Sequence, residues 1–179
     1  MALTATIYVF QVQLADVDRA VYTDLELRVA RHPSESAPFM LARLLAYCLE
    51  YREGITFTDG IGAVDEPAVL VRDLTGRITA WIEVGAPDAD RLHRGSKLAG
   101  CCALYTHKNP AALLAQLAGQ KIHRAAEIPL YSFGQAFMEQ ASAALQRRTK
   151  ISLSITERQL YLDVDGQMFS TEVTEQRLG

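Results

Sequence analysis

Two acidic residues, Asp65 and Glu83, have the surroundings and the spacing of a divalent-cation site. Glu83 interrupts an apolar segment, residues 78–85, whose composition is typical of a central strand. A carboxylate buried in such a strand needs a cation, hydrogen-bond donors or a proton to offset its lost hydration. Asp65 comes 18 residues earlier, just before a second apolar segment at 68–73. The two segments flank a Thr75-Gly76 turn, so a hairpin would bring Asp65 next to Glu83.

A shared Mg²⁺ or Mn²⁺ ion is the chemistry that such an acidic pair favours. One or two carboxylates hold Mg²⁺ while water and substrate phosphate complete its coordination shell. The ion polarises a phosphoryl group and activates water, which is the chemistry of phosphodiester hydrolysis. Two other interpretations stay open for Glu83: a strand-edge acid that faces solvent, or a partner for an internal arginine such as Arg43.

Charge is unevenly distributed along a chain whose formal net charge is −3. The stretch 53–90 carries eight acids against two arginines, whereas the stretch 91–126 contains no acid. This second stretch contains three of the four histidines and the following basic residues: Arg91, Arg94, Lys97, Lys108, Lys121 and Arg124. An acidic cluster followed by a basic stretch is typical of a cation site beside a nucleic-acid surface. The alternative is that these basic side chains merely cover solvated helix faces.

Hydrophobic periodicity predicts a mixed α/β (α+β) chain. Alternating residues at 4–14 and 23–31 predict two antiparallel strands, and the segment 151–173 predicts a three-stranded meander. The middle of the chain begins with the order α, β, β, β, α, β. Its expected elements are a helix from Ser34 or Ser36 to about Gly54, strands at 55–63, 68–73 and 78–85, a helix at 87–98, a strand at 101–106, a helix at 109–117, a strand at 128–133 and a helix at 135–146.

The composition is that of one globular domain spanning residues 1–179, with 49% apolar and 22% charged residues. No apolar run approaches the roughly 20 residues that cross a bilayer, and the N-terminus lacks the basic start of a signal peptide. Three cysteines without a CxxC pair favour reduced thiols over disulfides or a zinc site. We therefore expect a cytoplasmic protein without a membrane partner.

Four motifs resemble the YaeQ family of small bacterial proteins, in the same order and spacing and over essentially the whole chain. They are ARHPSE at 30–35, DEP at 65–67, WIEVGAPD at 81–88 and the segment 91–94. The resemblance implies a variant of the PD-(D/E)XK restriction-endonuclease-like fold, whose core has the αβββαβ order, with antiparallel strands added at both termini. It also implies a Mg²⁺-dependent nuclease site, which is an analogy at the level of the fold.

Carried onto this chain, the nuclease pattern implies Asp65 and Glu83 as metal ligands. Glu35, at the start of the first core helix, resembles the accessory acid that some of these nucleases place there. The pattern departs two residues after Glu83, where a lysine is expected and Gly85 stands instead. Glycine has no side chain with which to orient water or stabilise charge.

The helix that follows offers two basic residues in place of that lysine. Arg94 resembles the migrated lysine of the family, and Lys97 lies three residues later on the same helical face. Arginine stabilises charge on a phosphate but does not act as a base, so Lys97 is the better candidate for that role. Arg91 and His32 complete the candidate phosphate-binding set, although His32 is equally suited to local hydrogen bonds around Pro33.

Two functions from different classes follow. The first is a Mg²⁺- or Mn²⁺-dependent phosphodiesterase that acts on nucleic acid. The alternative is a catalytically inactive module that keeps the fold and the acidic pocket and binds nucleic acid or a protein partner through the stretch 91–126. Gly85 favours the second function, whereas the three acids Asp65, Glu83 and Glu35 favour the first. A structural protein with a vestigial pocket also stays open.

Overall fold

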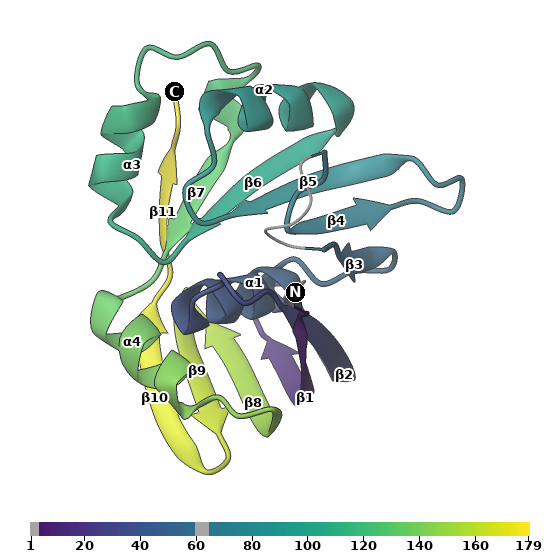
Figure 1. Cartoon of the computed structure of the whole chain (residues 1–179), viewed down its shortest axis with the longest axis vertical. Coiled ribbons are helices and arrows are strands. Elements are labelled where there is room, and N and C mark those ends of the chain that lie inside the picture. The colour runs from purple at the N-terminus through teal and green to yellow at the C-terminus, as the bar shows by residue number, and fades with distance from the viewer. Residues whose placement is uncertain (1–3, 60–64) are drawn as a thin grey trace. The chain divides into compact units, whose positions relative to one another are not determined.

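The structure, a computed structural model, describes residues 4–59 and 65–179. The chain divides into two compact units, the first made of Met1–Leu41 and Phe133–Val173 and the second of Ala42–Ser132 and Thr174–Gly179. Each unit contains one sheet, and the described residues form four α-helices, as expected for a mixed α+β chain (Figure 1). The expectation of a single domain over residues 1–179 stays a prediction.

The first unit holds a five-stranded sheet in the order β10-β9-β8-β1-β2. Its strands are β1 (Thr6–Asp16), β2 (Val21–Arg31), β8 (Arg148–Thr156), β9 (Gln159–Val164) and β10 (Gln167–Glu172). The predicted antiparallel pair β1 and β2 and the predicted meander β8-β9-β10 are confirmed. The two pieces join through a parallel pairing of β1 with β8, which places the N-terminal hairpin and the β8-β9-β10 meander in one sheet.

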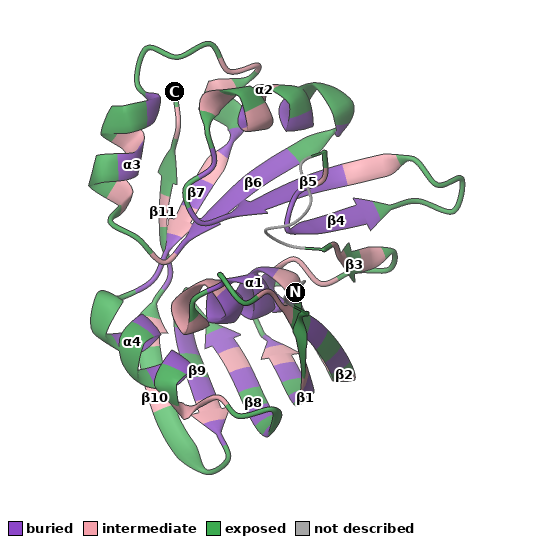
Figure 2. Ribbon diagram, viewed as in Figure 1, coloured by how far each residue is buried: buried purple, intermediate pink, exposed green. Residues whose placement is uncertain are grey.

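Alternation along the strands buries one face of this sheet. On β1, Phe10, Val12 and Leu14 are buried, whereas Gln11 and Gln13 on the opposite face are exposed. Figure 2 shows the same alternation of buried and more exposed residues along β8 and β9. Helix α4 (Gln135–Ala144) packs on β9 and β10. The face that carries the glutamines is therefore the polar one.

Helix α1 (Ala37–Leu49) crosses the division between the two units, which falls after Leu41. It begins where the sequence predicts, because the Ser36 hydroxyl accepts a hydrogen bond from the backbone N–H of Phe39 at 3.2 Å. Pro38 lies in the first turn, where the absence of a backbone N–H leaves no intrahelical bond unmade. No helix formed by the described residues combines the length and the hydrophobicity needed to cross a membrane.

The second unit holds a six-stranded mixed sheet in the order β11-β7-β6-β5-β4-β3. Its strands are β3 (Ile55–Phe57), β4 (Val69–Arg72), β5 (Ile78–Val84), β6 (Cys101–Thr106), β7 (Pro129–Ser132) and β11 (Thr174–Arg177). β4 and β5 form the predicted hairpin, and β5, β6 and β7 run parallel. With α1 before β3 and α2 (Ala89–Leu98) before β6, the elements follow the predicted αβββαβ order. β3 is shorter than the expected strand at 55–63, of which residues 60–63 lie outside the described residues.

One hydrophobic core joins this sheet to α2 and to α3 (Pro110–Leu117). Its buried residues are Trp81, Leu92, Ala99, Cys102, Leu104, Leu113, Leu117, Ile128 and Leu130. Trp81 is therefore a core residue. Gly95 sets how closely α2 approaches β5, since a Cβ at that position would overlap the indole ring of Trp81. This close approach brings the first turns of α2 beside Glu83.

Candidate functional site

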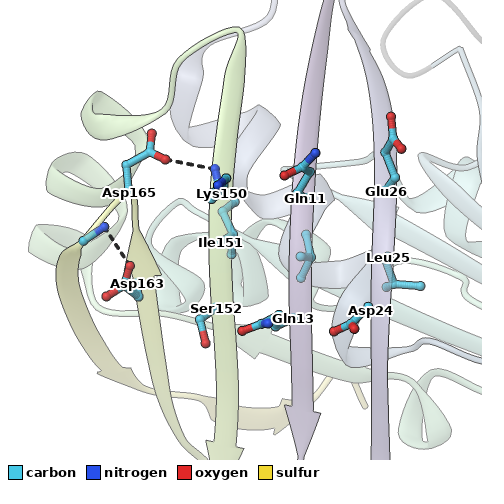
Figure 3. Close-up of a pocket in the computed structure, with 12 residues that line it drawn as sticks. Gln11, Gln13, Asp24, Leu25, Glu26, Lys150, Ile151, Ser152, Asp163 and Asp165 are labelled. Atoms are coloured by element: carbon cyan, nitrogen blue, oxygen red, sulfur yellow. Dashed lines mark hydrogen bonds between the residues drawn. The ribbon is translucent and has the colours of Figure 1, made fainter.

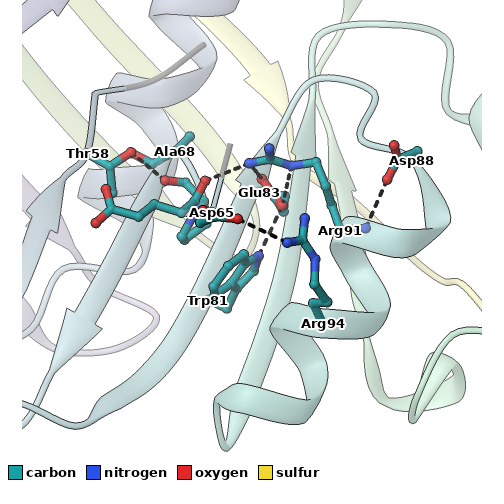
Figure 4. Close-up of polar contacts among 10 residues, drawn as sticks. Thr58, Asp65, Ala68, Trp81, Glu83, Asp88, Arg91 and Arg94 are labelled. Carbon is teal, nitrogen blue, oxygen red and sulfur yellow. Dashed lines mark hydrogen bonds and ion pairs between the residues drawn. The ribbon is translucent and has the colours of Figure 1, made fainter. Parts of the chain in front are cut away.

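Glu83 is a buried carboxylate whose two oxygens are both hydrogen-bonded. It lies in the central strand β5, and its side chain is 3% exposed. The Nε of Arg91 donates to Oε2 at 3.0 Å and its Nη2 donates to Oε1 at 3.2 Å. The indole N–H of Trp81 donates to Oε2 at 3.1 Å. These contacts, drawn in Figure 4, give Glu83 the forked partner that a buried carboxylate needs.

Arg91 also connects the two sides of the site. Its Nη2 donates to the backbone carbonyl of Glu66 at 2.6 Å, so one guanidinium bridges the segment before β4 and the strand β5. Asp88 caps the N-terminus of α2 by accepting the backbone N–H of Arg91 at 2.9 Å. This cap fixes the first turn of α2, and the first turn directs the Arg91 side chain back onto β5.

Asp65 belongs to the same site but lies in a different environment. Its side chain is 86% exposed, and its Oδ1 accepts a hydrogen bond from Nη1 of Arg94 at 3.2 Å. Arg94 is itself 48% exposed and lies one helical turn after Arg91 on the same face of α2. Each predicted metal-binding acid of the second unit therefore has an arginine of α2 as its partner. The expectation that Asp65 and Glu83 form one metal site stays a prediction, since each acid contacts a different arginine of α2 (Figure 4).

These side chains do not fit a divalent ion as they stand. The guanidinium of Arg91 contacts both oxygens of Glu83 and the Glu66 carbonyl, which are the oxygens that an ion at this point would use. A second cation at that point would meet the positive charge of Arg91 at close range. Within residues 4–59 and 65–179, no three His, Cys, Asp or Glu side chains gather as a metal-binding group. An ion could bind here only after Arg91 moved away.

The other predicted site residues of the ARHPSE motif lie in the first unit. Glu35 is buried, and its Oε1 accepts the backbone N–H of His32 at 3.2 Å. The His32 Nδ1 accepts the backbone N–H of Ser34 at 3.1 Å, which is the local arrangement around Pro33 that the sequence left open. Asp65 and Glu83 belong to the second unit. The assignment of Glu35 as a third metal ligand and of His32 as a phosphate contact stays a prediction.

Gly85 has a structural reason to be glycine. It follows β5 with a φ of +93°, a region that side-chain-bearing residues rarely adopt, and its N–H donates to the Tyr105 carbonyl at 2.8 Å. A lysine at this position would be strained by the backbone that turns β5 into α2. The nuclease pattern of a lysine two residues after the acid is therefore incompatible with this turn.

Basic residues of the stretch 91–126 gather around α2. Arg94 and Lys97 are exposed on this helix. The loop after α3, which carries the exposed Lys121 and Arg124, is tied to the same helix at His123. Ser96 Oγ donates to the His123 carbonyl at 2.6 Å, and the His123 N–H donates to Nδ1 of His93 at 3.0 Å. The loop after α3, which carries Lys121 and Arg124, is thus held against the helix that carries Arg94 and Lys97.

The role of Arg91 is what sequence reasoning missed. The internal arginine considered for Glu83 was Arg43, which is instead fully buried with its guanidinium carbon 5.9 Å from the centre of the Phe57 ring. The signal for Arg91 was present in the short connection after Glu83. The turn at Gly85 reverses the chain after β5, and Asp88 caps the helix that follows. Arg91, the third residue of that helix, therefore lies within reach of β5.

The comparisons with known proteins agree along nearly the whole chain. The family model described as YaeQ protein matches residues 1–173. The Escherichia coli protein described as "Uncharacterized protein YaeQ" is 33% identical over 175 residues, which are 97% of each chain. The crystal structure of YaeQ protein from Pseudomonas syringae is 30% identical, covers 98% of each chain and has a TM-score of 0.86. The crystal structure of YaeQ protein from Xanthomonas axonopodis pv. citri is 24% identical and has a TM-score of 0.89. The match covers 97% of this chain and 98% of that one, and it shows the shared fold. The chain therefore belongs to the YaeQ family.

Proposed function

We propose that this chain is a binding module for the phosphodiester backbone of nucleic acid. In this proposal its core is of the nuclease type, and the guanidinium of Arg91 takes the position of the metal ion. The forked contact between Arg91 and Glu83 is the observation that carries the proposal. It supplies the positive charge that the buried carboxylate requires, so the fold is complete without an added cation. The proposal keeps the PD-(D/E)XK variant as the parent fold, and the observed αβββαβ order supports it.

The basic surface around α2 supplies the binding contacts. Arg94, Lys97, Lys121 and Arg124 are exposed, and the hydrogen bonds of His123 hold the loop that carries the last two against α2. Contacts to phosphate oxygens give affinity without base specificity, and they weaken steeply with salt because bound counterions are released. The net charge of −3 belongs to the whole chain, whereas the stretch 91–126 contains no acid, so the attraction is local.

A metal-dependent nuclease is the second candidate function, and the exposure of Asp65 favours it. A carboxylate that is 86% exposed makes only a weak ion pair with Arg94, so this partner is easily displaced. In that function Asp65 and Glu83 would hold Mg²⁺ or Mn²⁺, and Lys97 or Arg94 would stabilise charge on the phosphate. Arg91 would first have to leave the oxygens of Glu83.

Substitution of Asp65 separates the two functions. The full-length chain, Asp65→Ala and Glu83→Gln are each incubated with labelled single- and double-stranded DNA and RNA, in EDTA or in Mn²⁺. The binding module predicts binding in EDTA, no cleavage that depends on either acid, and tighter binding by Asp65→Ala because Arg94 is released beside the phosphate surface. The nuclease predicts Mn²⁺-dependent cleavage that both substitutions abolish, and this result would overturn the proposal.

Matched lysine substitutions test the surface. Each phosphate contact to duplex DNA contributes about 0.9 to the slope of log affinity against log salt. The double variant Lys97→Ala/Lys121→Ala should therefore lower the magnitude of that slope by about 2. Lys150→Ala, which removes an exposed lysine from the first unit, is the control and should leave the slope unchanged. Equal effects of both variants would show that binding is unrelated to α2.

A further inference from the structure

A pocket of about 600 Å³ lies in the second unit, beside the basic surface around α2. Its floor is one face of the sheet, formed by Cys101 and Ala103 of β6 and by Pro129 and Tyr131 of β7. Three of these four side chains are small, so the floor is low at this point. Arg124 lines the pocket and also belongs to the basic surface, so the two features are continuous.

Three arginines line the pocket from three separate segments of the chain. Arg52 lies between α1 and β3, Arg124 precedes the 3₁₀ helix Ala125–Glu127, and Arg177 belongs to β11. Each of the three side chains is about half exposed, so its guanidinium is open to a ligand. Two of the three lie outside the basic stretch 91–126, and the charge pattern of the sequence does not connect them to it.

Glu127 brings two of these arginines together. The Nη1 of Arg177 donates to the backbone carbonyl of Glu127 at 3.1 Å, and the Nε of Arg124 lies 3.6 Å from Oε2 of the same residue. Glu127 itself lines the pocket. The guanidinium groups of Arg124 and Arg177 therefore border the same part of its wall.

The third arginine is tied to the floor through a tyrosine pair. The Nη1 of Arg52 lies 3.4 Å from Oε2 of Glu50, and Oε1 of Glu50 accepts a hydrogen bond from the Tyr105 hydroxyl at 2.8 Å. The Tyr105 ring stacks on that of Tyr131, with the ring centres 4.8 Å apart. Arg52 is thereby held over the same face of the sheet as the other two.

The ion pairs of the three arginines are weak enough for an anion to displace them. Their glutamate partners are Glu50, Glu127 and Glu175, at nitrogen–oxygen distances of 3.4, 3.6 and 3.4 Å. A strong charge-assisted hydrogen bond is about 2.7 to 2.9 Å long, and exposed pairs contribute little to stability. A phosphate group offers several oxygens to guanidinium forks at once, which a single carboxylate cannot do.

Charge and size favour a terminal phosphate over an internal one. A terminal phosphate carries about −1.5 to −2 charges at pH 7, whereas each phosphodiester group carries only one. The pocket volume falls within the range of about 300 to 1,000 Å³ that is typical of small-ligand sites. It accommodates one nucleotide-sized group, whereas a duplex is too large for it.

The larger hollow of the first unit has the opposite charge. It measures about 880 Å³ and lies over β1, β2, β8 and β9, with polar side chains in rows across these strands (Figure 3). Four acids line it against one lysine: Asp24, Glu26, Asp163, Asp165 and Lys150. Repulsion from these acids disfavours phosphate there, so the arginine-lined pocket is the better phosphate site.

We propose that the arginine-lined pocket binds the terminal phosphate of a single nucleic-acid strand whose backbone lies on the basic surface around α2. Arg52, Arg124 and Arg177 bind the phosphate oxygens. The assignment rests on the proposed function, because the surface around α2 holds the rest of the strand, and it adds a preference for phosphorylated ends.

Strands that differ only at their ends test this preference. Fluorescence anisotropy in EDTA measures the affinity of the full-length chain for one single-stranded DNA sequence, labelled internally, with a 5′-phosphate, a 3′-phosphate or hydroxyl groups at both ends. One of the phosphorylated strands should bind roughly tenfold or more tightly than the hydroxyl-ended strand. Arg52→Ala/Arg177→Ala should reduce this ratio to about one. Arg147→Ala/Arg148→Ala, which removes two exposed arginines from the first unit, is the matched control and should leave the ratio unchanged.

Cys101 gives an independent readout of occupancy, because it is exposed and lies on the pocket floor. At equal saturation, the preferred phosphorylated strand should slow its labelling by a thiol reagent more than the hydroxyl-ended strand does. Equal affinity for all three strands would overturn the inference and leave the proposed function standing, whereas no binding of any strand would overturn both. A free nucleoside 5′-monophosphate that protects Cys101 as well as the phosphorylated strand, at the same concentration, would assign the pocket to free nucleotides and also overturn the inference.

Discussion

Removal of Arg91 is the sharpest test of how the acidic site is held together. Arg91→Ala leaves Glu83 buried in β5 with the Trp81 indole as its one remaining donor among the contacts described above. Removing one partner of a buried ion pair typically costs about 3 to 5 kcal/mol. The Arg91 side chain is 24% exposed, so water can reach part of the vacated space and the loss falls at or below the lower end of that range. We expect a loss of about 2 to 3 kcal/mol in the free energy of unfolding.

Urea unfolding and thermal unfolding measure this loss. For a chain of this size, 1 kcal/mol corresponds to about 2 to 4 °C in the melting temperature, so Arg91→Ala should melt roughly 4 to 12 °C below the unsubstituted chain. Arg94→Ala is the matched control, because it removes an arginine from the same helix face whose partner Asp65 is exposed. It should cost less than about 1 kcal/mol.

Divalent ions give the second half of the same test. If Arg91 stands in the place of a cation, its removal exposes Glu83 oxygens and the Glu66 carbonyl to an added ion. Mn²⁺ at ten times its dissociation constant would then stabilise Arg91→Ala by about 1.4 kcal/mol. The unsubstituted chain should show no such increase in melting temperature. The reasoning is refuted if Arg91→Ala is as stable as Arg94→Ala, or if Mn²⁺ stabilises the unsubstituted chain and Glu83→Gln abolishes that effect.

Three further predictions concern the surroundings of the site. Gly95→Ala should lower the unfolding free energy by about 1 to 3 kcal/mol, measured by urea unfolding, because the added methyl overlaps the Trp81 ring. A thiol reagent should label one cysteine per native chain rapidly, and Cys101→Ser should remove that signal, because Cys101 is exposed whereas burial raises the pKa of Cys102 to about 12. Burial and the neighbouring Lys108 lower the pKa of His107 from its ordinary 6.5. The contribution of neutral His107 to folding stability is therefore complete above pH 6.5 and is lost as the pH falls through the lowered folded-state pKa. In unfolding experiments over a pH series, His107→Gln should make the free energy of unfolding less dependent on pH in this range.

Local signals in the sequence were sufficient to predict the helices and strands that an apolar run or a capping residue marks. The strand at 101–106 and the helix starts after Asp88 and Asn109 are confirmed, because an apolar run or a capping side chain marks each of them. Strand β11 was not predicted, because Thr174–Arg177 has no apolar alternation. It exists through its pairing with β7, a partner more than 40 residues away. The parallel pairing of β1 with β8 is hidden for the same reason.

The candidate site shows a similar division between local and distant information. The spacing of the hairpin predicts that Asp65 and Glu83 share a site, and the family resemblance implies Arg94 near them; the structure has Arg94 in contact with Asp65. The electrostatic partner of Glu83 was not predicted, because the contact depends on how closely α2 approaches β5. That approach is set by Gly95 against Trp81, a pair that no periodicity identifies.

The turn at Gly85 connects the chemistry of the site to its architecture. The positive φ of Gly85 excludes the lysine that the nuclease pattern places there, and the same turn starts α2 close enough to β5 for Arg91 to reach Glu83. The absence of a lysine at position 85 and the contact of Arg91 with Glu83 are thus two consequences of one backbone conformation. A lysine placed at position 85 would strain this turn and leave Arg91 on the carboxylate. A Gly85→Lys variant should therefore remain without metal-dependent cleavage, whereas cleavage gained by this single substitution would show that the turn is more tolerant than its φ implies.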